Sequence, residues 1–194
     1  MKIHTTWISG LLGLCLCIAS GTALATTVLK ISLNEMTLGS DLIIQGSIKS
    51  AETVAIGGNE RHLQTQVVVD IRNVLKGQKG MKSLRLELMG GKLGKWVMHI
   101  PGMPTFTPGE EVVLFLEKTR TNWALTGLSQ AKFVVQKGSD GIQRVRRTVE
   151  GLHFMKRNKS GRILETEPPK PMVQELGSFL AEIRTYLTAA KKAQ

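Results

Sequence analysis

The residues best suited to chemistry are a serine and a lysine three positions apart, Ser129 and Lys132, in a Gly-Leu-Ser-Gln-Ala-Lys run. A desolvated lysine amine can accept the proton of a serine hydroxyl and activate it as a nucleophile. Ser-x-x-Lys enzymes place this pair on a helix and carry a Lys-Thr-Gly companion, which the sequence lacks. A nucleophile elbow would need glycine at Ala131. We therefore predict structural roles for Ser129 and Lys132.

Residues that could bind a metal or form an acid/base pair are sparse. His62, His99 and His153 are the histidines after residue 25, and none has another histidine or a cysteine at ligand spacing. Glu110 and Glu111 are adjacent, so on a strand their side chains point to opposite faces. We expect no catalytic residue, no metal and no cofactor, and predict that the protein is not an enzyme.

Positive charge is the strongest compositional feature. The chain has 26 Lys and Arg against 15 Asp and Glu, a formal net charge of +11, and the excess is concentrated in residues 137–162. Such a basic stripe attracts nucleic acid, anionic lipid or acidic polysaccharide. The alternative is that the positive surface only keeps the protein soluble. The candidate residues for binding an anionic polymer are Arg144, Arg146, Arg147, Lys156 and Arg157.

A second candidate binding region is the glycine-rich loop over residues 90–95, which Trp96 follows. The loop lacks the spacing of a phosphate-binding loop, because Trp96 stands where serine or threonine is required. As a binding loop beside a small barrel, it would present Lys92, Lys95 and Trp96 to a partner. The alternative is that Trp96 caps the core.

The first 25 residues predict a secretory signal peptide. An apolar run over residues 7–19 leads to Ala-Leu-Ala at 23–25, which is the pattern that signal peptidase cuts. The run is shorter than the about 20 residues that span a bilayer, so no membrane span is expected after cleavage. Cleavage would leave Thr26 as the first residue and would remove both cysteines. We expect an exported protein, periplasmic or secreted, without disulfides.

The elements that must position these residues are mostly strands. A capping-box pattern at Ser32 and Glu35 predicts a short helix over residues 32–39, and Gly46 predicts a bend or bulge in the strand that follows. Apolar residues at spacings of three and four predict a C-terminal amphipathic helix. Alternation and turn residues predict strands over 41–48, 64–75, 83–89, 111–117, 123–126, 131–136 and 142–148.

These elements predict a mainly β fold: a small OB-like barrel with a short N-terminal helix and a C-terminal helix. The expected organisation is a signal peptide over 1–25, a barrel domain over 26–155, a linker over 156–170 and a helix over 171–190 that docks on the barrel.

Several short motifs occur in an order that resembles the order of motifs in the netrin-type domains. This family includes the tissue inhibitors of metalloproteinases. Residues 26–44 resemble the start of those domains, Val74-Leu75-Lys76-Gly77 resembles their strand-ending Lys-Gly, and residues 110–114 resemble a later strand. The chain is also similar to a group of exported bacterial proteins with the patterns S-D-x-I-x-x-G, V-L-K-G and P-G-E-x-V-L-x-F-L. The resemblance extends over about residues 26–136.

This resemblance implies an OB-type barrel that binds a protein partner. In the inhibitors, the amine and carbonyl of the first mature residue chelate the zinc of the protease. The matching residue is Thr26, and Thr27 stands where the family often has threonine or serine. The family's first residue is a disulfide-bonded cysteine, which Thr26 is not. We therefore predict an exported non-enzymatic module that binds a protein, with a secreted zinc metalloprotease as one candidate and an anionic polymer as the alternative partner.

Overall fold

A computed structural model describes residues 26–149, 151–158 and 160–192. The predicted signal peptide lies outside the described residues. The strands outnumber the helices and include two long ones, β2 (Leu42–Ile56) and β3 (Asn59–Lys76). The other strands of the large sheet are β4 (Ser83–Met89), β7 (Glu111–Lys118), β8 (Trp123–Leu125), β9 (Lys132–Lys137), β10 (Gln143–Arg147) and β13 (Met172–Glu175).

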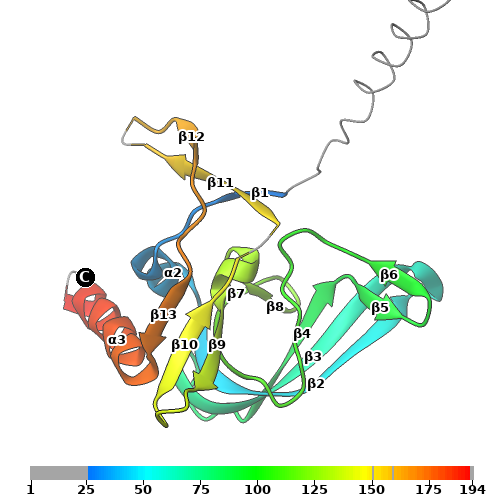
Figure 1. Cartoon of the computed structure of the whole chain (residues 1–194), viewed down its shortest axis with the longest axis horizontal. Helices are drawn as coiled ribbons and strands as arrows, with labels where there is room; N and C mark the ends of the chain where they lie inside the picture. The colour runs from blue at the N-terminus through cyan, green and yellow to red at the C-terminus, as the bar shows by residue number, and fades with distance from the viewer. Residues whose placement is uncertain (1–25, 150, 159, 193–194) are drawn as a thin grey trace, which may run out of the picture.

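The large sheet has the strand order β13-β10-β9-β7-β2-β3-β4, and β8 pairs with β7. All of its pairings are antiparallel. The sheet is strongly curved along its two long strands, β2 and β3 (Figure 1). The bend predicted at Gly46 is confirmed, because the β2–β3 register shifts between Gln45 and Gly46, and a Cβ on Gly46 would lie 2.2 Å from the Asp70 carbonyl oxygen. Only glycine allows so close a backbone approach.

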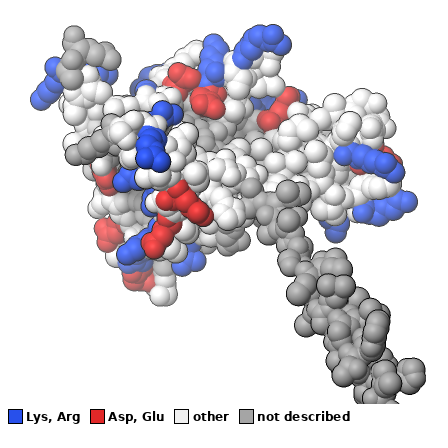
Figure 2. All heavy atoms as spheres, turned by 90° about the horizontal axis from the view of Figure 1, so that it is seen from above, with Lys and Arg blue, Asp and Glu red and all other residues white. Residues whose placement is uncertain are grey.

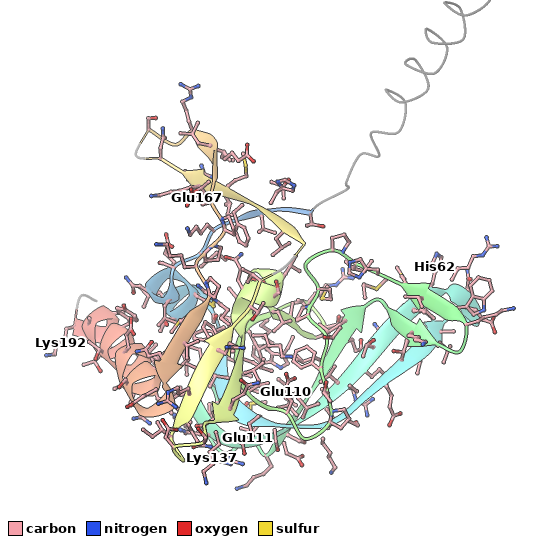
Figure 3. The ribbon with its side chains drawn as sticks, in the orientation of Figure 1. His62, Glu110, Glu111, Lys137, Glu167 and Lys192 are labelled. Atoms are coloured by element: carbon pink, nitrogen blue, oxygen red, sulfur yellow. The ribbon has the colours of Figure 1, made fainter. Side chains whose placement is uncertain are left out.

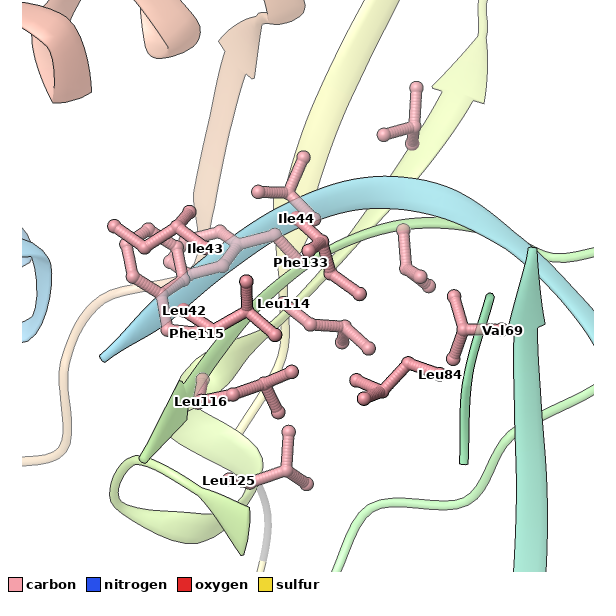
Figure 4. Close-up of a cluster of buried hydrophobic side chains, with 14 of the residues drawn as sticks. Leu42, Ile43, Ile44, Val69, Leu84, Leu114, Phe115, Leu116, Leu125 and Phe133 are labelled. Atoms are coloured by element: carbon pink, nitrogen blue, oxygen red, sulfur yellow. The ribbon is translucent and has the colours of Figure 1, made fainter. Parts of the chain in front are cut away.

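The core lies around β7, as its nearly continuous apolar sequence predicts. Five consecutive residues, Val112 to Leu116, are completely buried. Phe115 packs against Phe133 of β9 with ring centroids 5.4 Å apart, and Phe133 lies 4.8 Å from Phe179. Figure 4 shows Phe115 and Phe133 among the leucine and isoleucine side chains of this cluster. The aromatic cluster therefore joins the middle of the sheet to the C-terminal helix.

Helix α2 (Leu33–Gly39) confirms the predicted N-terminal helix. Ser32 Oγ accepts the Glu35 N–H at 3.2 Å, and Glu35 accepts the Ser32 N–H at 2.8 Å, which completes the capping box. At the other end, Lys76 Nζ donates to the carbonyl oxygens of Thr37 and Leu38. Both ends of this short helix are thus satisfied by side chains.

The segment predicted as a linker contains sheet structure. Strand β12 (Ile163–Thr166) pairs antiparallel with β11 (Leu152–Arg157), and β11 pairs in parallel with β1 (Thr26–Leu29). These strands form a separate three-stranded sheet that projects from the large one (Figure 1). Sequence alone did not predict it because β1 and β11 come from distant parts of the chain.

The C-terminal helix α3 (Leu176–Lys192) begins five residues later than the predicted start at 171. Residues 172–175 instead form β13, because they pair with the free edge of β10. The helix then covers this edge by packing on β10 and β13. The end strands β13 and β4 do not pair with each other, so the mainly β fold with two helices is confirmed but the sheets do not close into a barrel.

Two smaller elements complete the fold. The hairpin of β5 (Gly91–Leu93) and β6 (Trp96–Met98) packs on the outer ends of β2 and β3. A short 3-10 turn, η2 (Leu128–Ala131), precedes β9. None of the helices in the described part of the chain combines the length and the apolarity needed to cross a membrane.

Candidate functional site

The cationic residues predicted as one stripe are divided between two strands, and the three on β10 are divided between its two faces. Val145 is buried, and because side chains alternate along a strand, Arg147 shares its face whereas Arg144 and Arg146 lie on the other. Arg144 binds both carboxylate oxygens of Asp140, at 3.0 and 2.6 Å. These hydrogen bonds lower the pKa of Asp140 to about 2. On the face shown in Figure 2, Lys and Arg side chains likewise form separate groups.

Arg147 is a partly buried cation whose charge has no acidic partner among the described residues. Its guanidinium carbon lies 5.3 Å from the centroid of the Phe133 ring, and its Nε is buried without a hydrogen-bond acceptor among the described residues. Burial lowers the pKa of this guanidinium, so its surroundings disfavour the charge. A desolvated charge without a partner is destabilising. An anion bound here would relieve that cost.

Three further cationic residues line the cavity beside Arg147. Lys30, from the connection between β1 and α2, and Lys156 and Arg157, from β11, line the same cavity of 570 Å³. We call this cavity the Arg147 pocket. Its size falls within the range of small-ligand sites, about 300–1,000 Å³. Four cationic residues from three segments therefore line one cavity.

One carboxylate lines the Arg147 pocket, that of Glu35. It is already engaged, because Glu35 Oε2 accepts the hydroxyl of Ser32 at 2.6 Å and the Ser32 backbone N–H at 2.8 Å. These two hydrogen bonds, followed by the charge of Lys156, lower the pKa of Glu35. The lining thus has an excess of positive charge, which suits a carboxylate, phosphate or sulfate group.

The pocket wall formed by residues 29–32 is held by a buried amide. Gln130, which is completely buried, accepts the Ile31 N–H at 3.0 Å and donates to the Leu29 carbonyl oxygen at 3.0 Å. The Lys30 N–H donates to the Met155 carbonyl oxygen at 2.8 Å. Gln130 is therefore a positioning residue that fixes the backbone of Lys30 beside β11.

Comparison with known proteins does not extend this picture. No protein-family model, no curated protein and no solved structure matches the chain. The netrin-type resemblance therefore stays a prediction. Within residues 26–149, 151–158 and 160–192, no group of three or more His, Cys, Asp or Glu side chains is placed to hold a metal ion.

The residues of the Ser-x-x-Lys pattern line a different cavity, of 660 Å³. Lys132 Nζ lies 2.9 and 2.7 Å from the two carboxylate oxygens of Glu110 and donates to the Thr105 carbonyl oxygen at 2.6 Å. A lysine held in this ion pair is a poor base for Ser129, whose buried Oγ has no described hydrogen-bond partner. Glu111 binds Arg72 instead, at 2.8 Å, and Figure 3 shows Glu110 and Glu111 where β7 begins. The geometry thus favours a structural pair at Lys132.

The five residues predicted to bind a protein partner are not brought together. Thr26 and Thr27 lie in β1, where they pair with β11. Lys92, Lys95 and Trp96 belong to the β5–β6 hairpin, at the end of β3 where Figure 3 places His62. Zinc chelation by Thr26 stays a prediction.

Trp96 lies at the surface of this hairpin and is absent from the core cluster and its packing partners. Lys95 Nζ lies 5.3 Å from the centroid of the indole ring, and the guanidinium carbon of Arg61 lies 6.0 Å from it. Trp96 is half-buried, and the two cations lie against its ring at cation–π distances. This packing favours the prediction of a contact residue over that of a core cap.

Sequence reasoning named Arg147, Lys156 and Arg157 but missed Lys30 and the role of Gln130. The signal for Arg147 was available, because it lies two residues after Val145 and so shares the core face of the same strand. No local signal marks Lys30. It reaches the pocket because β1 pairs with a strand more than 120 residues away along the chain.

Proposed function

We propose that the protein is an exported, non-enzymatic binding module that holds acidic groups of an anionic polymer in the Arg147 pocket. One observation carries the proposal: the partly buried guanidinium of Arg147 has no acidic partner among the described residues. A protein gains nothing in stability from such a group. An unpaired arginine at this position is explained if a bound ligand supplies the anion that pairs with it.

The kind of ligand follows from the lining. Arg147 offers a planar guanidinium, which can bind two oxygens of a phosphate, sulfate or carboxylate at once. Lys30, Lys156 and Arg157 add charge around it without fixing one geometry. This arrangement suits repeated acidic groups on a flexible chain better than a single shaped metabolite. The predicted protein partner would be bound through an acidic segment of the same kind.

The salt dependence of binding tests the proposal. A fluorescein-labelled oligothymidylate serves as a defined polyanion, and each phosphate neutralised on a single strand contributes about −0.7 to the slope of log K against log salt concentration. Four cations predict a slope of about −3. Arg147→Met should weaken binding and make the slope less steep by about 0.7. A heparin fragment in the same assay compares sulfate and carboxylate with phosphate.

Arg144→Gln is the matched control, because it removes an arginine of the same strand whose charge is already paired with Asp140. It should leave the affinity and the slope nearly unchanged. Equal loss of affinity in both variants would show that only overall charge matters. Binding that does not change between about 50 and 200 mM salt would refute the proposal.

A further inference from the structure

A third cavity, of 670 Å³, lies between α2, the end of β3 and α3. We call it the α2–α3 groove. Its apolar surface comes from Leu38 of α2, Leu75 of β3 and Leu187 of α3. Leu75 and Leu187 also pack against the core, but Leu38 does not, and 44% of its surface is exposed. Three leucines, one exposed and two packed against the core, thus line one concave surface that an apolar ligand can cover.

The rim of the α2–α3 groove is cationic. Lys76, Lys79, Arg184 and Lys191 line it, and the described lining contains no Asp or Glu. Arg184, Leu187 and Lys191 share one face of α3, because they are spaced three and four residues apart. The helix thus presents an apolar side chain between two cations on the side that faces the groove.

Two of these cations are held in place by uncharged groups. Lys76 Nζ donates to the carbonyl oxygens of Thr37 and Leu38 at 3.0 and 2.7 Å, and Lys79 Nζ donates to the carbonyl oxygen of Val74. Carbonyl oxygens orient an ammonium group without neutralising it. Both ammonium groups are therefore positioned in advance. The carboxylate of Asp41 acts on Lys76, so Lys79 offers the less compensated charge to an anion.

We propose that the α2–α3 groove binds a free single-chain anionic amphiphile, with its alkyl chain along Leu38, Leu75 and Leu187 and its acidic head at Lys76 and Lys79. Charge complementarity requires an acidic head, and the apolar surface requires a chain. The groove volume suits a small molecule, since such sites measure about 300–1,000 Å³. Its ten lining residues are fewer than the about 20–30 residues on each side of a stable protein interface.

Titration calorimetry with decanoate, below its micelle concentration, tests this site. Decanoate should bind, and butanoate should bind at least about tenfold more weakly because its chain covers less of the apolar surface. Decyl maltoside has the same chain with an uncharged head and should also bind at least about tenfold more weakly. Equal binding of butanoate would show that only charge is recognised, and equal binding of decyl maltoside would show that the cations are unused. Either result would overturn the proposal.

Variants locate the binding. Lys79→Glu and Leu38→Ser should each weaken decanoate binding about tenfold. The matched controls Lys49→Glu and Ile163→Ser change an exposed lysine of β2 and an exposed isoleucine of β12, and should not weaken it. Circular dichroism confirms that each variant is folded. Loss of binding in the controls, or retention in both groove variants, contradicts the assignment.

Arg147→Met separates this site from the Arg147 pocket. The groove proposal predicts that this variant still binds decanoate with unchanged affinity. If it loses decanoate and the groove variants do not, the carboxylate is bound by Arg147 and the groove is not the site. Sedimentation with vesicles of anionic phospholipid distinguishes a membrane surface: binding to vesicles without binding to free decanoate would also overturn the proposal.

Discussion

At Arg147 the requirements of packing and of charge differ. Its guanidinium lies over the ring of Phe133, which itself packs against Phe179, so an apolar side chain would pack well here. The charge there is disfavoured by burial. The residue type therefore fits the pocket better than it fits the fold.

Replacement of Arg147 by methionine should make the protein more stable in the absence of anions. We expect Arg147→Met to raise the free energy of unfolding by about 1 kcal/mol, or the melting temperature by about 2–4 °C. Phosphate should raise the melting temperature of the original protein more than that of the variant. Scanning calorimetry with and without phosphate measures both effects.

The control for this experiment is Arg72→Met, which removes an exposed arginine paired with Glu111. It should change the melting temperature little. A fall in melting temperature for Arg147→Met, with no response to phosphate in the original protein, would mean that the charge of Arg147 is already compensated within the fold.

Among the elements, α2 connects the two cationic cavities. Ser32 and Glu35, at the start of this helix, line the Arg147 pocket, and Leu38, near its end, lines the α2–α3 groove. The capping box fixes the first turn and Lys76 fixes the last. A helix of seven residues is too short to be stable alone, so these side-chain hydrogen bonds at its two ends help to hold it in position.

The capping box predicts a pH dependence of stability. The folded state lowers the pKa of Glu35, so its carboxylate stabilises the protein above the unfolded pKa of about 4.5, and this contribution is lost as the pH falls through the lower folded pKa. Glu35→Gln should therefore unfold more easily at pH 7, by a few tenths of a kcal/mol. The difference between the two proteins should start to shrink below about pH 4.5 and vanish once the pH is below the lowered pKa of the folded state.

Urea unfolding at a series of pH values measures this difference. Glu117→Gln, at an exposed position of β7, is the control and should alter stability little at any of these pH values. A difference for Glu35→Gln that is constant from pH 7 to the acid limit would show that the carboxylate does not act through its charge.

Local patterns predicted those elements whose partners are near in sequence or whose burial is unambiguous. The capping box of Ser32 and the apolar run of β7 are examples. The start of α3 was predicted too early because residues 172–176 carry apolar side chains at helical spacing, yet pairing with β10 outweighs that preference. Lys30 was missed for a similar reason, since only a long-range strand pairing brings it to Arg147.

At the scale of the whole molecule, the two main sheets differ in how deeply they are buried. The large sheet contributes most of the core. In the described strands β1, β11 and β12, by contrast, Phe154 is the only apolar residue that is buried. Ile163 and Leu164 of β12 are about half exposed. Stability is therefore unequal across the chain, with the small sheet as the weaker unit.

Hydrogen exchange should resolve these two units. We expect backbone amides of β11 and β12 to exchange faster than those of β2 and β7, because the small sheet can open without exposing the core around Phe115. Binding of a polyanion in the Arg147 pocket should slow exchange in β11, which carries Lys156 and Arg157. Mass spectrometry of peptic fragments measures both. Uniform protection across all four strands would mean that the sheets open together.

The parallel pairing of β1 with β11 has a consequence for how the molecule is completed. Strand β1 (Thr26–Leu29) is the first described element, and it pairs with β11 (Leu152–Arg157), the central strand of the small sheet. One edge of β11 therefore stays unpaired until β1 binds to it. A synthetic peptide of residues 26–32 should then associate with a chain that begins at 33. Such two-piece reconstitution would assemble one wall of the Arg147 pocket from a separate molecule and restore Lys30 to it.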